Sequence, residues 1–174
     1  EKTGLALRFE KGMPGGPAEP HCAYTVFKAL AARSGSRENS VGWACTGLGG
    51  GVALSGAVCG GLLGAILGLG LEYGIDPDSM GFGSIVKAFV VWHRNLVKHE
   101  SFAKGPVEAL PKEAFARSRY LADRFEKAFG SLNCKEITGR KFGAPDELNA
   151  FLPESKVCRE IFTWCEQEAG KLMT

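Results

Sequence analysis

The chain has 174 residues, of which 45% are hydrophobic, and a formal net charge of +2. A chain of this length can bury about 70% of its extended surface as one domain without disulfide bonds. The small net charge argues against a nucleic-acid-binding protein, and the six cysteines form no CxxC or CxxCH pattern, which excludes a thioredoxin-type motif, a zinc ribbon and the usual haem attachment site.

We divide the chain into a loop-rich N-terminal segment, 1–20, and a single helical, cysteine-rich domain, 21–174. The first segment contains KGMPGGPAEP, in which proline and glycine disfavour regular structure. The domain begins with a predicted helix over 21–33, which has a proline suited to its first turn and a glycine just past its end. A second helix is predicted over 36–48, where three successive glycines stop it.

The third predicted helix is rich in glycine and carries no charge along most of its length. Ser55 is a suitable cap, and the helix would run to Tyr73. No charged residue occurs between Glu38 and Glu72, and Val52 to Leu71 is long enough to cross a bilayer core of about 30 Å. Four glycines also recur at every fourth position, a spacing that lets helix backbones approach closely: Gly56, Gly60, Gly64 and Gly68.

Two interpretations of this segment follow. No aromatic belt and no cluster of lysine or arginine flanks it, and these absences argue against a membrane span. A helix that is apolar on all sides also suits the centre of a helical bundle. We therefore expect a buried central helix and keep membrane association as the alternative.

Helical patterns continue through the rest of the chain. We predict a fourth helix over 83–100, a fifth over 114–130, a short turn-helix piece over 131–139, a loop over 140–155 and a last helix over 156–172. In the fifth helix an aromatic and aliphatic pattern at helical steps indicates core positions: Phe115, Tyr120, Leu121, Phe125 and Phe129. No segment alternates with the period of a strand, so the predicted fold class is all-α, a bundle of about five to seven helices around the central glycine-rich apolar helix.

Four cysteines share one feature, a place in the first turn of a predicted helix: Cys22, Cys59, Cys134 and Cys158. The unpaired N–H groups at a helix start are expected to lower a thiol pKa and to stabilise a thiolate or an anionic metal–sulfur centre. Four thiolates are the usual ligands of [2Fe-2S] and [4Fe-4S] clusters and also suit zinc. Gly60 and Gly61 would keep the wall of such a pocket free of side chains and expose main-chain N–H groups.

Residue type and spacing alone leave other roles open for these cysteines. Cysteines are often buried as small hydrophobic residues. In an exported chain they could instead form disulfides, pairing Cys22 with Cys59 and Cys134 with Cys158.

The two remaining cysteines and a neighbouring histidine are also considered. We expect Cys45 and Cys165 to pack in the core, although Cys165 lies seven residues after Cys158 and could serve as a substitute ligand or a resolving thiol. His21 precedes Cys22, and we expect an exposed loop histidine. Its alternative roles are to donate a hydrogen bond to a sulfur or to replace a cysteine ligand.

The chain resembles the C-GCAxxG-C-C family of redox-active bacterial and archaeal proteins, which has a first cysteine, a Cys-Gly-Ala-x-x-Gly box and two later cysteines. The box corresponds to CGGLLG at 59–64, with Gly61 where the box has alanine. The other family cysteines match Cys22 in HCAYTVF, Cys134 in FGSLNCKEITG and Cys158 in KVCREIF. The likeness spans about residues 20 to 170 and does not include Cys45 or Cys165.

The family is also similar to the non-haem domain of split-Soret-type cytochromes, in which cysteines of this pattern are thought to carry an iron-sulfur centre. The resemblance implies an iron-sulfur cluster, [2Fe-2S] or [4Fe-4S], bound by Cys22, Cys59, Cys134 and Cys158. It further implies electron transfer or redox sensing with a redox partner protein, and an oxidoreductase subunit or electron-transfer protein rather than a stand-alone enzyme.

Other functions remain open at this stage. One is a thiol/disulfide redox protein without metal, and another is a membrane-associated helical accessory module. The glycines also suit a homodimer, because they would let a second subunit approach closely. We expect a soluble protein and leave the compartment open between cytoplasm and periplasm.

Overall fold

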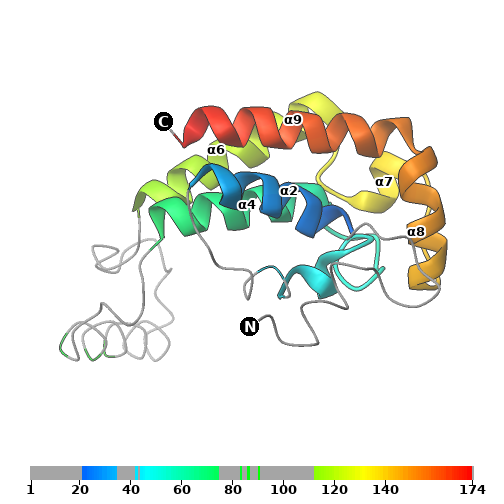
Figure 1. The fold of residues 1–174 in the computed structure, drawn as a ribbon, viewed down its shortest axis with the longest axis horizontal. Helices are drawn as coiled ribbons and strands as arrows, with labels where there is room; N and C mark the ends of the chain where they lie inside the picture. Colours follow the sequence, from blue (N-terminus) through cyan, green and yellow to red (C-terminus); the bar gives the residue numbers. More distant parts are fainter. Residues whose placement is uncertain are drawn as a thin grey trace.

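Figure 1 shows a computed structural model of the chain, in which residues 21–34, 42, 44–74, 83, 86, 90 and 112–173 are described. These residues form helices joined by turns and contain no strand, so the predicted all-α fold is confirmed. In chain order the helices are α2 (Cys22–Arg33), the short 3-10 helix η1 (Cys45–Leu48), α4 (Gly60–Tyr73), α6 (Lys112–Phe129), α7 (Cys134–Thr138), α8 (Pro145–Glu154) and α9 (Lys156–Leu172).

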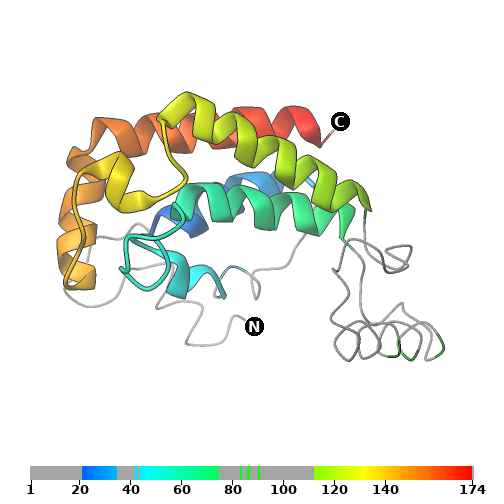
Figure 2. The same cartoon turned by 180° about the vertical axis from the view of Figure 1, so that it is seen from behind.

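Three long helices of the bundle run in the same direction. Helices α2, α4 and α9 all begin at the right-hand end of the view in Figure 1 and run to the left, whereas α6 runs the opposite way. Figure 2 shows the same arrangement from behind, with α7 and α8 at the end where the three parallel helices begin. The N-terminal ends of several helices, with their partial positive charges, therefore lie at one end of the molecule.

The apolar helix α4 lies at the centre of the main core, as predicted. Its Leu62 and Leu69 are buried against Leu121 and Phe125 of α6 and Ile161 of α9. None of these five side chains is more than 1% exposed. Burial of each stabilises the fold by about 1.5–3 kcal/mol, which offsets the low helix propensity of the glycines in α4.

The glycines of α4 face helix α2. A Cβ atom on Gly64 would overlap the carbonyl oxygen of Ala23, and one on Gly68 would lie 2.8 Å from Cβ of Leu30. The two backbones therefore approach more closely than side chains would allow. The predicted close-packing role is confirmed for these two positions, with α2 as the neighbouring helix.

The start of α4 differs from the prediction. The helix begins at Gly60, with Cys59 as its N-cap, rather than after Ser55. The Ser55 hydroxyl instead donates to the carbonyl oxygen of Gly51 in the preceding loop. The predicted Ser55 cap is therefore wrong, because this serine takes part in a turn.

That loop has a left-handed backbone. Five consecutive residues have φ between 50° and 78°: Gly50, Gly51, Val52, Ala53 and Leu54. The turn is held by hydrogen bonds from the Ala53 amide to the carbonyl of Gly47 at 2.7 Å and from the Gly56 amide to the carbonyl of Gly50 at 3.0 Å. Left-handed φ values cost about 1 kcal/mol or more for residues with a side chain, so the surrounding contacts must maintain this conformation.

The predicted loop over 140–155 is also wrong in its second half, which forms helix α8. Pro145 occupies a first-turn position, where its missing N–H is not needed. Asp146 and Glu147 follow it and complement the positive end of the helix dipole. Pro153 lies close to the C-terminal end, where it removes a single intrahelical hydrogen bond.

Helix α6 starts two residues earlier than predicted and buries only part of its expected core stripe. Leu121 and Phe125 are fully buried, and Phe129 packs against Phe125 with ring centroids 4.7 Å apart. Phe115 is 62% exposed and Tyr120 is 49% exposed, so their assignment to the core is wrong. The physical reason is that α4 and α9 cover one face of α6 and these two side chains lie off that face.

Several predicted features lie outside the described residues. These are the N-terminal segment 1–20, the first part of the helix predicted over 36–48, and most of the helix predicted over 83–100. Of the 36–48 prediction, the described end forms η1. Among the described residues, no helix combines the length and the apolar character that crossing a membrane requires.

Candidate functional site

Each of the four family cysteines lies at the start of a helix. Cys22 and Cys134 are the first residues of α2 and α7, and Cys59 is the N-cap of α4. Cys158 is in the first turn of α9, where its amide donates to the hydroxyl of Ser155 at 3.3 Å. All four side chains are buried, with 5–7% exposure.

Backbone hydrogen bonds hold the Cys59 and Cys134 segments side by side. The Cys134 amide donates to the carbonyl of Ala57 at 2.7 Å, and the Cys59 amide donates to the carbonyl of Leu132 at 2.8 Å. Val58 and Asn133 form an antiparallel bridge between these two bonds. The two cysteines, far apart in sequence, are therefore positioned by one short ladder.

Glycines bring Cys22 and α9 up to the start of α4. A Cβ atom on Gly60 would overlap the sulfur of Cys22, and one on Gly61 would lie 2.8 Å from Cγ2 of Ile161 in α9. Any larger residue at either position would push a neighbouring element away. Gly60 and Gly61 thus let Cys22 and α9 approach the start of α4 closely.

The four thiols also interact with one another electrostatically. A charge on Cys22 raises the pKa of Cys59 and Cys134, a charge on Cys158 raises the pKa of Cys22 and Cys134, and a charge on Cys134 raises that of Cys59. The sulfurs of four different helix starts therefore share one region. No disulfide joins any of the described cysteines.

Main-chain amides donate toward two of these sulfurs. The Gly50 amide in the left-handed loop donates to Cys22, and the amides of Gly61 and Leu62 donate to Cys59. Such donors favour negative charge on sulfur. Thr138 and Ser155 also act to lower the pKa of Cys134 and Cys158. The Thr138 hydroxyl donates to the carbonyl oxygen of Cys134 at 2.7 Å, and the Ser155 hydroxyl accepts from the Cys158 amide at 3.3 Å.

Burial nevertheless outweighs these donors. It raises the pKa of Cys59 to about 12 and that of Cys134 to about 11, and it raises the pKa of Cys22 and Cys158 as well. Repulsion from neighbouring thiolates adds to the effect at Cys22, Cys59 and Cys134. The prediction that helix starts lower these pKa values is therefore wrong for the protein without a metal.

His21 is not the exposed histidine that we predicted. It is the N-cap of α2 and is half-buried, and its Nδ1 atom is buried without a hydrogen-bond partner among the described residues. Burial also lowers the pKa of its imidazole. Its position beside Cys22 was the one feature of the sequence that indicated a role at the site. Its burial could not be predicted, because it depends on contact with Gly49, which is distant in sequence.

Cys45 and Cys165 lie in the core, as predicted. Cys45, the first residue of η1, packs with Ala23, Phe27 and Ala31, and Cys165 belongs to the main core together with Cys59. Neither is exposed. Cys165 is also coupled electrostatically to Cys59, and burial raises the pKa of its thiol.

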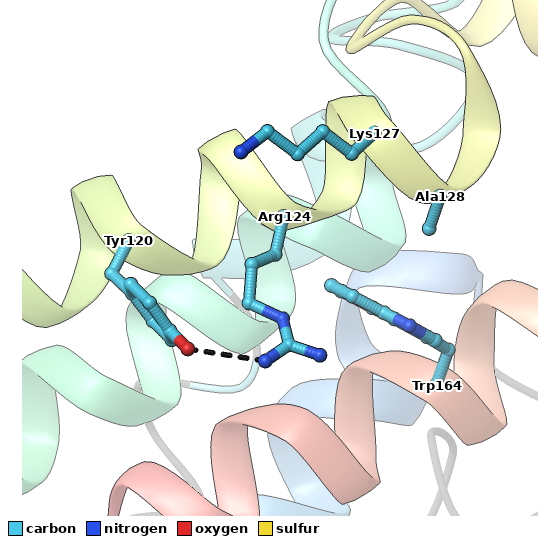
Figure 3. Close-up of a pocket in the computed structure, with 5 residues that line it drawn as sticks. All are labelled: Tyr120, Arg124, Lys127, Ala128 and Trp164. Carbon is cyan, nitrogen blue, oxygen red and sulfur yellow. Dashed lines mark hydrogen bonds between the residues drawn. The ribbon is translucent and has the colours of Figure 1, made fainter.

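A surface pocket between α6 and α9 was not predicted from the sequence. Tyr120, Arg124, Lys127, Ala128 and Trp164 line it (Figure 3). Arg124 donates to the hydroxyl of Tyr120 at 3.1 Å and pairs with Glu168 at 3.1 Å. The pocket lining contains no cysteine or histidine, and we assign it no redox role.

Within the described part of the chain, no three side chains of histidine, cysteine, aspartate or glutamate are arranged to hold one metal ion. Comparison with family models gave a match over residues 20–172, to the family described as "Putative redox-active protein (C_GCAxxG_C_C)". No curated protein and no solved structure matched. Since the match covers most of the sequence, the chain belongs to the C-GCAxxG-C-C family of redox-active proteins.

Proposed function

We propose that this protein transfers electrons through one iron-sulfur cluster bound by Cys22, Cys59, Cys134 and Cys158. The observation that carries the proposal is that four buried cysteines each lie at the start of a different helix, with electrostatic interactions linking Cys22, Cys59, Cys134 and Cys158 in a chain. When bound, such a cluster supplies a one-electron redox couple. The proposed partner is another redox protein.

The surroundings of the sulfurs suit an anionic metal–sulfur core. The main chain would donate to cluster sulfurs from Gly50, Gly61 and Leu62, and the helix N-termini would add their partial positive charge. Gly60 and Gly61 allow the Cys22 sulfur and α9 to come close to the start of α4. The buried Nδ1 of His21 has no hydrogen-bond partner among the described residues, which is consistent with a partner at this site.

The arrangement of ligands is also compatible with a cluster. A cluster distributes its thiolates over two or four irons, so at most two protein sulfurs need to bind any one ion. The proposal therefore does not require three side chains around a single metal ion.

A thiol/disulfide cycle is the competing function, and the thiol pKa values argue against it. Reactive cysteines are partly exposed and have a lowered pKa, because the thiolate is the nucleophile. Here the cysteines are buried and the pKa of Cys59 is about 12. A metal overcomes this barrier by displacing the thiol protons as it binds.

The test is to purify the protein without oxygen, or to load it with ferrous iron and sulfide, and to measure iron, sulfide and visible absorbance. We expect a brown protein whose charge-transfer absorbance bleaches with dithionite. Serine in place of Cys22, Cys59, Cys134 or Cys158 should lower the iron content by at least about half, since each change removes one of the four ligands.

The matched control is Cys45→Ser, which changes an equally buried cysteine in a separate part of the core. It should bind as much iron as the wild type, even if it is less stable. A colourless wild-type protein with stoichiometric zinc or no metal contradicts the proposal. A colourless protein whose thiol count falls by two or four on oxidation favours the disulfide cycle.

A further inference from the structure

His21 lies at the edge of the cysteine region. Its backbone is fixed, because its carbonyl oxygen accepts hydrogen bonds from the amides of Tyr24 and Thr25 at 3.0 and 3.2 Å. Its side chain lies against the glycine-rich loop, where a Cβ atom on Gly49 would lie 3.4 Å from Cβ and 3.6 Å from Cγ of His21. The next residue of that loop, Gly50, is the one whose amide donates to the Cys22 sulfur.

The buried Nδ1 of His21 needs an explanation. A buried polar atom without a hydrogen bond is destabilising, and native proteins contain few such atoms. In a neutral imidazole one of the two ring nitrogens carries a proton and the other is an acceptor. The missing partner is therefore an acceptor for an N–H group, or a donor if the proton is on Nε2.

We propose that Nδ1–H of His21 donates a hydrogen bond to a sulfur of the cluster that Cys22 helps to bind. The inference rests on the proposed function. His21 is then a positioning residue rather than a ligand, and it adds a side-chain donor to the main-chain donors at Gly50 and Gly61. Donation to a cluster sulfur stabilises the reduced, more negative state, so the hydrogen bond raises the reduction potential.

Three substitutions separate this role from a structural one. His21→Asn places an amide N–H where Nδ1 lies, His21→Gln places one near Nε2, and His21→Leu keeps bulk without any donor. In cluster-loaded proteins, the reduction potential should match the wild type in His21→Asn and should fall in both His21→Gln and His21→Leu. Resonance Raman frequencies of the iron–sulfur stretches should shift in the same two variants.

Stability is measured separately, because asparagine is also a favourable N-cap residue. Capping would raise the melting temperature of His21→Asn without changing its potential. If His21→Leu does not fold, the comparison of His21→Asn with His21→Gln is still sufficient to test the inference.

Equal potentials and spectra in wild type, His21→Asn and His21→Gln overturn the inference while leaving the proposed function intact. Loss of cluster iron from both His21→Gln and His21→Leu also overturns it. A residue that only donates a hydrogen bond to a sulfur does not hold the iron, so such a loss would mean that His21 acts as a ligand or as a structural residue. If the wild-type protein takes up no iron and sulfide, the proposed function fails, and the inference fails with it.

Discussion

At the scale of single residues, burial and helix position have opposite effects on the cysteines, and magnitude decides between them. A helix N-terminus favours an anion by about 0.3–1 kcal/mol, which is less than one pKa unit. Full burial can shift a pKa by about 3–5 units. The raised pKa values of Cys59 and Cys134 follow from this difference, and they mean that these two thiols are protonated near neutral pH in the metal-free protein.

The left-handed loop allows a test at the same scale. Ala53 is exposed and has φ of 50°, a conformation that glycine adopts without strain. Ala53→Gly should raise the free energy of unfolding by up to about 1 kcal/mol, measured by urea denaturation, because relief of strain exceeds the entropy gained by the unfolded chain. Ala57→Gly is the control, since Ala57 is in the same loop but lacks a positive φ, and it should be destabilising. Equal effects of the two changes would show that the loop is not strained.

What the sequence could predict at this scale depends on whether the cause is local. The placement of Cys22, Cys134 and Cys158 at helix starts follows from nearby caps and turns, and it was predicted. Cys59 was also expected at a helix start, but after a Ser55 cap, whereas it is itself the N-cap of α4. The burial of His21 was not predicted, because it depends on contact with Gly49, which lies far along the chain. The left-handed conformation of Val52 was missed because a β-branched residue rarely adopts it.

At the scale of elements, α4 shows how a helix with poor propensity is stabilised by its neighbours. Its glycines let α2 pack backbone to backbone, and this contact brings the first residue of α2 beside the N-cap of α4. The glycine spacing predicted a close-packing face, although it could not identify the neighbouring helix. Helix α8 was missed because two prolines and a glycine resemble a loop in sequence, although the prolines occupy positions near the helix ends.

Two glycine substitutions in α4 test this packing. A Cβ atom at Gly64 would overlap the backbone of Ala23, whereas one at Gly70 meets nothing within 4 Å. Gly64→Ala should therefore lower the free energy of unfolding by about 1–3 kcal/mol through overpacking. Gly70→Ala should raise it by up to about 1 kcal/mol through helix propensity. The measurement is urea denaturation of both variants, and a stabilising Gly64→Ala would mean that α2 does not approach α4 as described.

At the scale of the whole molecule, the parallel arrangement of α2, α4 and α9 makes one end of the bundle different from the other. Four helix N-termini lie toward that end, including that of α7 (Figures 1 and 2), and each of these helix starts carries a cysteine. The free energy of unfolding therefore depends on whether the thiols at this end are protonated. In the metal-free protein, burial of a thiol is favourable while the thiol keeps its proton and becomes unfavourable when it loses the proton.

This coupling predicts how stability depends on pH in the metal-free protein. The ordinary thiol pKa is 9.0, and in the folded protein it is about 12 for Cys59 and about 11 for Cys134. Between pH 9 and 11 the unfolded chain has lost these protons and the folded protein has kept them. The unfolded state binds fewer protons, so the free energy of unfolding falls as pH rises, by up to about 1.4 kcal/mol per pH unit for each thiol.

Lysine and tyrosine titrate in the same range, so the measurement is a comparison between proteins rather than one curve. Urea denaturation of metal-free wild type and Cys134→Ser from pH 8 to 11 should show a shallower decline in the variant, because one of the buried thiols is gone. In the iron-loaded protein the folded state already holds thiolates. Below the ordinary thiol pKa its stability should then rise with pH, because the unfolded chain binds the additional protons. Identical slopes in metal-free wild type and Cys134→Ser would mean that burial does not hold the Cys134 proton, and the argument against a thiol/disulfide cycle would lose its physical basis.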